Sequence, residues 1–252
     1  MDYKYIINAP EDKVVVVPAR LGSAPANMLN ARLDSYGNTK FKAELLFDLE
    51  DEKGAGAQRE LMNLWQSIYF PLVNAESKED LTKEQIDTIP IKTGKATLDD
   101  WKKAEKQKGT YDEEKFFEEG TKNDVLKTHN LMRVNQKETN ATTGAKNKIF
   151  VRDMEGREVN AATVGTLIKA GDYGDFLLRY YTIGGAGKDI FPRAVFSLVG
   201  FQKTADGKAI KLGSFSSDEE VAAKFFKKPS KSSSAATDDA DLSADEVNDL
   251  LG

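Results

Sequence analysis

The spacing of apolar residues changes from every second residue to every third or fourth between positions 40 and 72. The stretch from Lys40 to Leu49 alternates, which predicts a strand with one face in the core and lysines on the other. Apolar residues at helical spacing come next: Leu61, Leu64, Trp65, Ile68 and Leu72. They predict one apolar helix face that ends near Pro71. A chain with both patterns must pack a helix on a sheet.

Strand patterns occur on both sides of this helix. They cover residues 14–17, 148–153, 173–183 and 190–204. Glycine-rich turns separate the later strands, at 171–174, 184–187 and 206–207. The chain is therefore predicted to form strands, one helix and strands again.

A polar segment at about 76–147 separates the helix from the later strands. Thr82 and Gln85 have capping-box spacing, and Gly120 follows two glutamates as a helix end. Residues 134–147 are small, polar and free of aromatics, which predicts a loop. The segment has too few apolar residues for a core of its own, so we expect a polar helical insertion.

This order of elements suits a small barrel better than an α/β sheet. We predict a mainly β fold with helical insertions (α+β), built as an OB-fold-like Greek-key barrel over residues 1–228 with the insertion at about 76–147. The Ser/Ala-rich residues 229–237 are predicted to form a flexible linker, and residues 238–252 a disordered acidic tail.

The composition excludes several kinds of chemistry. The chain has no cysteine and a single histidine, His129, which removes disulfides, thiolate zinc and multi-histidine metal sites. Gly184 to Lys188 resembles a phosphate-binding loop, but Thr182 and Asp189 stand where that motif needs Gly and Ser or Thr. We predict no catalytic residue, no metal, no cofactor and no enzyme activity.

No stretch approaches the ~18–20 consecutive apolar residues of a membrane span. The first thirty residues also lack the pattern of a signal peptide. We expect a cytoplasmic protein that does not bind a membrane.

The net charge of −5 conceals a separation of charge along the chain. Residues 125–216 hold 14 Lys and Arg against 8 Asp and Glu, whereas 76–124 holds 10 against 14. The last fifteen residues contain six acids and no Lys or Arg. The positive charge is thus concentrated in the second half, before the tail.

Cations lie beside aromatics on one face of several predicted strands. The nine candidate ligand-binding residues are Lys40, Lys42, Lys148, Phe150, Arg152, Arg179, Tyr181, Lys188 and Arg193. Cations neutralise phosphates and aromatic rings stack on unpaired bases, so single-stranded nucleic acid is the ligand that uses both. The alternative is an ordinary amphipathic sheet with a solvated basic face and Phe150 or Tyr181 packed under the insertion.

The tail alternates acids with apolar residues and is too short to fold alone. Its candidate partner-binding residues are Asp238, Asp239, Asp241, Asp245, Glu246, Asp249, Leu250 and Leu251. Such a segment is suited to occupying a basic groove or to docking its leucines on a partner protein. The alternative is a tail that only increases solubility.

Two stretches carry a resemblance to a known family. Lys40–Phe47 followed by a helix, and Asp172–Asp175 leading through Gly184–Gly187 to Val195–Gly207, resemble phage single-stranded DNA-binding proteins of an OB-fold family formerly catalogued as a domain of unknown function. The resemblance covers about 13–75 and 148–213 and implies an OB-fold that binds single-stranded DNA. The insertion at 76–147 is a departure from that family.

The tail carries a second resemblance. Ser232–Asp241 and Asn248–Leu251 are similar to acidic tails of phage replication single-stranded DNA-binding proteins, including a zinc-containing type. Those tails recruit replication and recombination proteins. Because the chain has no cysteine, it cannot share the thiolate zinc site of that type.

The sequence therefore favours a protein that binds and protects single-stranded DNA in phage replication, recombination and repair, in the cytoplasm of the bacterial host. Its tail would recruit replication proteins and compete with DNA. A viral structural or assembly protein with an acidic interaction tail is the alternative, and a hydrolase built on acidic residues is a weaker one. The oligomeric state and the preference between DNA and RNA are not predicted.

Overall fold

The computed structural model describes residues 3–140, 142–185 and 190–212. The sheet contains β1 (Ile7–Ala9), β2 (Val14–Leu21), β3 (Arg32–Leu33), β4 (Thr39–Asp48), β5 (Ile91–Lys92), β6 (His129–Lys137), β7 (Phe150–Arg152), β8 (Tyr173–Ile183) and β9 (Arg193–Ala205). The helices are η1 (Pro25–Met28), α1 (Glu52–Val73), η2 (Lys78–Asp80), α2 (Lys83–Ile86), α3 (Gly94–Lys108), α4 (Glu113–Phe116), α5 (Lys122–Val125) and α6 (Val164–Leu167).

Five strands close a barrel in the order β2, β8, β9, β6, β4 and back to β2. The last contact is short and joins Arg20 and Leu21 of β2 to Leu46 and Leu45 of β4. All of these pairings are antiparallel except that of β6 with β9. The first barrel strand thus lies between the second and the fourth, and the third pairs with the fifth in parallel, as in an OB-fold. The predicted fold class is confirmed.

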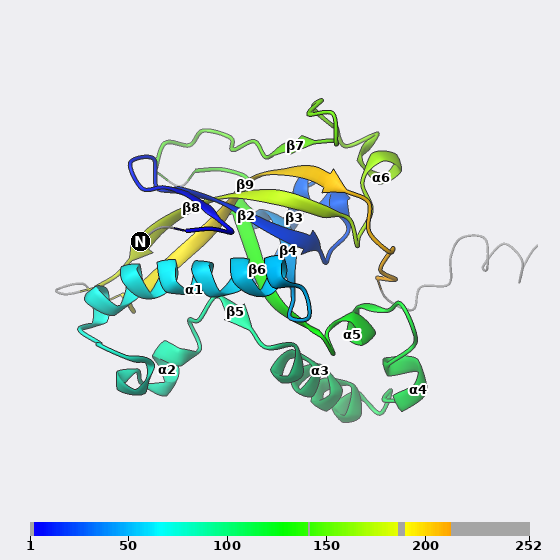
Figure 1. The fold of residues 1–252 in the computed structure, drawn as a ribbon, viewed down its shortest axis with the longest axis horizontal. Coiled ribbons are helices and arrows are strands. Elements are labelled where there is room, and N and C mark those ends of the chain that lie inside the picture. Colours follow the sequence, from blue (N-terminus) through cyan, green and yellow to red (C-terminus); the bar gives the residue numbers. More distant parts are fainter. Residues whose placement is uncertain (1–2, 141, 186–189, 213–252) are drawn as a thin grey trace, which may run out of the picture. The chain divides into compact units, whose positions relative to one another are not determined.

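Helix α1 supplies much of the core. Asp51 caps its first turn by accepting a hydrogen bond from the Gly54 backbone N–H at 2.8 Å, and Asn74 ends it in the left-handed conformation. Trp65 and Tyr69 on its apolar face are fully buried, and their rings stack with centroids 4.8 Å apart. Figure 1 shows α1 running alongside the strands, as the change of apolar spacing predicts.

The insertion is smaller than predicted, because β6 lies inside the stretch assigned to it. This barrel strand has no alternating pattern in its first half, since residues 129–132 are all buried. Leu131 faces a second apolar cluster formed with the insertion, while Met132 faces the barrel core. A strand covered on both faces gives no period-two signal.

The loop predicted at 134–147 starts inside β6, and its described residues after Lys137 form a short excursion between β6 and β7. The Asn147 backbone N–H donates to the Glu138 carbonyl at 2.7 Å, and Asn140 N–H donates to the Ala145 carbonyl at 2.8 Å. Strand β7 then pairs in parallel with β9 further along the edge that β6 contacts. The chain therefore leaves the sheet after β6 and returns at β7 to the same partner strand, β9.

The remaining insertion packs on the outside of the barrel near β5 and β6, where Figure 1 shows α3, α4 and α5 grouped together. Leu98 of α3, Phe116 and Leu126 share a buried cluster with Leu46 of β4 and Leu131 of β6. The insertion thus completes its core with side chains from the barrel, in agreement with its low apolar content. The predicted linker, tail and end of the domain, from residue 213 onward, lie outside the described residues.

Candidate nucleic-acid interface

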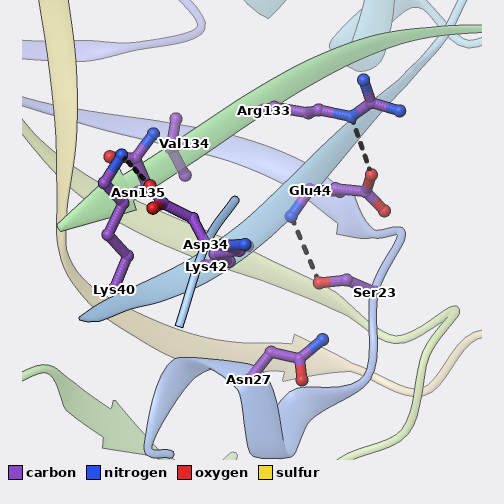
Figure 2. A pocket seen from close by; sticks show the side chains of 10 residues that line it. Ser23, Asn27, Asp34, Lys40, Lys42, Glu44, Arg133, Val134 and Asn135 are labelled. Carbon is purple, nitrogen blue, oxygen red and sulfur yellow. Dashed lines mark hydrogen bonds and ion pairs between the residues drawn. The ribbon is translucent and has the colours of Figure 1, made fainter. Parts of the chain in front are cut away.

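A groove lies on the outer face of β4 and β6, beneath the segment that joins β2 to β4. Its volume is about 400 Å³, and it is lined by Ser23, Asn27, Asp34, Lys40, Lys42, Ala43, Glu44, Arg133, Val134 and Asn135. Figure 2 shows that the lining side chains come from these two strands and from the preceding connection. Strands β4 and β6 are the second and third strands of the barrel, the face on which OB-folds hold oligonucleotides and oligosaccharides.

The two predicted lysines in the groove differ in their surroundings. Lys40 forms an ion pair with Asp34, with Nζ 2.7 Å from the carboxylate. This contact, together with backbone N–H groups of residues 36 and 38, holds the pKa of Asp34 well below its usual range. Lys42 is exposed and has no ion pair among the described residues. Lys42 is therefore the cation of this pair that is free to meet a ligand.

A carboxylate and two cations lie at the other side of the groove. Glu44 accepts a hydrogen bond from Arg133 Nε at 3.1 Å and from the Lys122 ammonium group of α5. The Glu44 backbone N–H donates to Ser23 Oγ at 3.2 Å. Figure 2 shows Arg133 and Glu44 facing each other from neighbouring strands. This cluster carries one more positive than negative charge.

Arg179 of β8 lies on the same transverse row of the sheet as Lys42. Lys42 pairs with Asn135 of β6, Asn135 with Ser197 of β9, and Ser197 with Arg179. Neighbouring strands lie about 4.8 Å apart, so the path along the sheet from Lys42 to Arg179 is roughly 14 Å. Lys42, Asn135 and Arg179 are exposed on it, and Ser197 is buried between Asn135 and Arg179. The barrel thus brings together cations that are far apart in the sequence.

Tyr181 and Arg193 lie close to this row on β8 and β9. Tyr181 pairs with Val195, two residues before Ser197, and its side chain is 41% exposed. Burial raises the pKa of its phenol. Arg193 is exposed at the start of β9, opposite Ile183.

The third group of predicted residues lies around β7. Phe150 and Arg152 are exposed and pair with Gly200 and Gln202 of β9. The Lys148 ammonium group lies 5.3 Å from the centre of the Phe150 ring and 2.6 Å from the Glu158 carboxylate. Phe150 is thus an exposed ring beside a cation, but that cation already has a carboxylate partner.

The predicted residues therefore occupy three groups on the outer surface of one sheet, and their roles remain predictions. The groups are Lys40 with Lys42, then Arg179 with Tyr181 and Arg193, then Lys148 with Phe150 and Arg152. Lys188 and all eight tail residues lie outside the described residues.

The sequence analysis missed the part of the groove that β6 supplies. Arg133, Asn135 and Lys137 are exposed on alternate positions, and Val134 between them is buried. This alternation was a usable strand signal that the polar composition of 134–147 concealed. Asn27 was also missed, and its Oδ1 atom is buried in the groove lining without a hydrogen-bond partner among the described residues.

The described residues contain no group of three or more His, Cys, Asp or Glu side chains that is placed to hold a metal ion. None of the helices in this part of the chain is both long enough and apolar enough to cross a bilayer.

The strand order and the position of the groove define an OB-fold protein. Two solved structures of the single-stranded DNA-binding protein from bacteriophage Enc34 share this fold. The complex with single-stranded DNA has a TM-score of 0.51 and 11% sequence identity, over 79% of this chain and 90% of that one. A C-terminal truncation has a TM-score of 0.52 and 11% identity, over 83% and 95% of the chains. The predicted resemblance in fold is thus confirmed.

Comparison of amino-acid sequences alone does not detect the similarity to these proteins. No protein-family model matches the chain, and no curated protein matches it at a significant level. The likeness therefore lies in the arrangement of the strands, since few residues are identical.

Proposed function

We propose that the chain binds single-stranded DNA without sequence preference. The observation that carries the proposal is the groove on the second and third barrel strands, continued across the sheet by exposed cations and aromatics. Cations along a groove neutralise phosphates whatever the sequence, and rings stack on any unpaired base. The proposed activity is binding, with no chemical step.

Each predicted residue has a role in this proposal. The phosphate-binding residues are Lys40, Lys42, Lys148, Arg152, Arg179, Lys188 and Arg193. Phe150 and Tyr181 would stack on bases, for which their partial exposure leaves room. The fold shared with the Enc34 protein, solved with single-stranded DNA, supports the choice of ligand.

The wider role we propose is protection of single-stranded DNA in phage replication, recombination and repair, in the cytoplasm of the bacterial host. The tail at 238–252 would compete with DNA for the basic surface and recruit replication proteins when DNA displaces it. Its acids and terminal leucines support both parts of this proposal.

Fluorescence anisotropy of a labelled oligo-dT against the full-length chain, at several salt concentrations, tests the activity. We expect tight binding to the single strand, weaker binding to a duplex of equal length, and a log–log salt slope of about −0.7 for each phosphate contacted. No binding to the single strand at low salt would contradict the proposal.

The double variant Arg179→Ala with Tyr181→Ala tests the site. It removes one phosphate contact and one stacking ring, so we expect affinity to fall at least about tenfold. Arg59→Ala with Tyr3→Ala is the matched control, because it removes the same two residue types outside the groove and the transverse row. If the two double variants bind DNA with equal affinity, Arg179 and Tyr181 are not part of the interface.

A further inference from the structure

A tryptophan of the insertion lies beside the groove. Trp101 of α3 is half-buried, and two cations lie over its ring: Lys122 Nζ at 5.4 Å and the Arg133 guanidinium carbon at 5.7 Å from its centre. Arg133 also lines the groove. Arg133 therefore lines the groove on the barrel and also lies over an aromatic ring of the insertion.

The charges around this ring are unbalanced. Glu44 is the carboxylate that both Lys122 and Arg133 contact, so two cations share one anion. Burial lowers the pKa of Lys122, although Glu44 acts in the opposite direction. A partly desolvated ammonium group that shares its anion gains from a second one, such as a phosphate.

The position of Trp101 is fixed by contacts between α3 and the barrel. Thr93 caps the helix by accepting from Ala96 N–H at 3.2 Å, and Gly94 N–H donates to the Asn130 side chain of β6 at 2.9 Å. Leu98, one turn before Trp101, is buried against the outer side of β4 and β6. The ring is therefore held beside Arg133, which lines the groove.

We propose that Trp101 is a nucleic-acid contact, on which one base of the strand stacks where the strand passes Arg133. The inference rests on the proposed function and extends it, because it makes the insertion a wall of the interface. An aromatic ring next to phosphate-binding cations is the arrangement that single strands use. The bases need no particular identity for this contact.

The chain offers an unusually direct test, since it contains two tryptophans and one of them is fully buried. In a Trp65→Phe background, all indole emission comes from Trp101. Unlabelled oligo-dT should quench this emission over the same concentrations at which the anisotropy of a labelled oligo-dT shows binding. The wild-type chain, in which Trp65 is shielded in the core, should show quenching at the same concentrations.

The two readouts separate the possible failures. Binding by anisotropy with unchanged indole emission would overturn the role of Trp101 and leave the proposed function standing. No binding by anisotropy would overturn both.

Affinity measurements on Trp101→Ala and Trp101→Phe give a second test. We expect roughly a five- to hundredfold loss for Trp101→Ala and a small loss for Trp101→Phe, which keeps a ring. Tyr111→Ala is the matched control, because Lys102 and Lys106 lie over the Tyr111 ring and neither contacts the groove. A lower melting temperature of Trp101→Ala with unchanged affinity of the folded protein would show a structural role only and overturn the inference.

Discussion

Asp34 makes two kinds of contact at one end of the groove. It orders the turn before β4, and it pairs with a lysine that would otherwise be available to a phosphate. Its Oδ1 atom accepts hydrogen bonds from Tyr36 N–H and Asn38 N–H, both at 2.9 Å, and so shapes the turn before β4. Its other oxygen holds the Lys40 ammonium group. The carboxylate therefore stabilises the turn at the edge of the groove and also neutralises one of the cations in the groove.

The substitution Asp34→Asn keeps the hydrogen bonds of the turn and removes the ion pair. The amide oxygen can still accept from both backbone N–H groups, while Lys40 loses its ionic partner. Partly exposed ion pairs contribute about 0–1 kcal/mol, so we expect DNA affinity to rise up to about fivefold at low salt, measured by anisotropy.

The control for this variant is Asp87→Asn, which makes the same change of net charge on an exposed residue outside the groove. Equal gains from the two substitutions would mean that only the net charge matters. Sequence could predict that Lys40 and Lys42 share a face, but it could not show that one of them is paired. The turn at 34–38 joins β3 to β4 and brings Asp34 to Lys40.

At the scale of elements, α3 is held unusually close to the chain that precedes β6. A Cβ atom on Gly94 would lie 2.0 Å from the Leu126 carbonyl oxygen and 2.2 Å from that of His129. Both of these atoms belong to the backbone, so they cannot move aside as a flexible side chain would. The absence of a side chain at Gly94 is what allows α3 to approach β6.

Gly94→Ala should therefore lower the free energy of unfolding by about 1–3 kcal/mol or more, measured by chemical denaturation. Gly165→Ala in α6 is the matched control, because no atom of the part of the chain that the structure describes lies within 4 Å of the added Cβ atom. We expect that control to be neutral or slightly stabilising. Equal stability of the two variants would contradict the close approach of α3.

Sequence predicted the second half of α1, all of β8 and most of β9, because each of these stretches has a clear pattern of its own. It did not predict β6, whose first half is buried on both faces and whose second half is polar. Only part of the groove was therefore predicted. Lys40 and Lys42 lie on a strand whose alternating pattern was recognised, whereas Arg133 and Asn135 lie on the strand that was missed. The position of Trp101 beside them depends on packing between elements, which no local pattern records.

At the scale of the whole molecule, the acidic tail and the basic sheet carry opposite charges within one chain. If the tail competes with DNA, removal of residues 238–252 should tighten DNA binding at low salt, and the gain should fall as salt screens both interactions. Anisotropy titrations of the full-length and truncated chains at several salt concentrations measure this difference.

A second tail variant distinguishes charge from length. It keeps all 252 residues and replaces the six tail acids with Asn or Gln. Competition through charge predicts that this variant behaves like the truncated chain. Unchanged affinity in both variants would leave the tail with a partner-binding role only.

The excursion between β6 and β7 has an evolutionary consequence. The chain leaves the sheet after Lys137 and pairs with β9 again at Phe150, so the pairings of β6 and of β7 with β9 both lie outside the excursion. Each doubling of a loop costs only about 0.6 kcal/mol of closure entropy. The excursion starts next to the groove, where Glu138 N–H donates to the Thr39 carbonyl at 2.9 Å. Residues inserted there would therefore change the surroundings of the groove and leave the barrel strands as they are. A lineage can therefore acquire new binding preferences at this point by insertion, without first having to redesign its core.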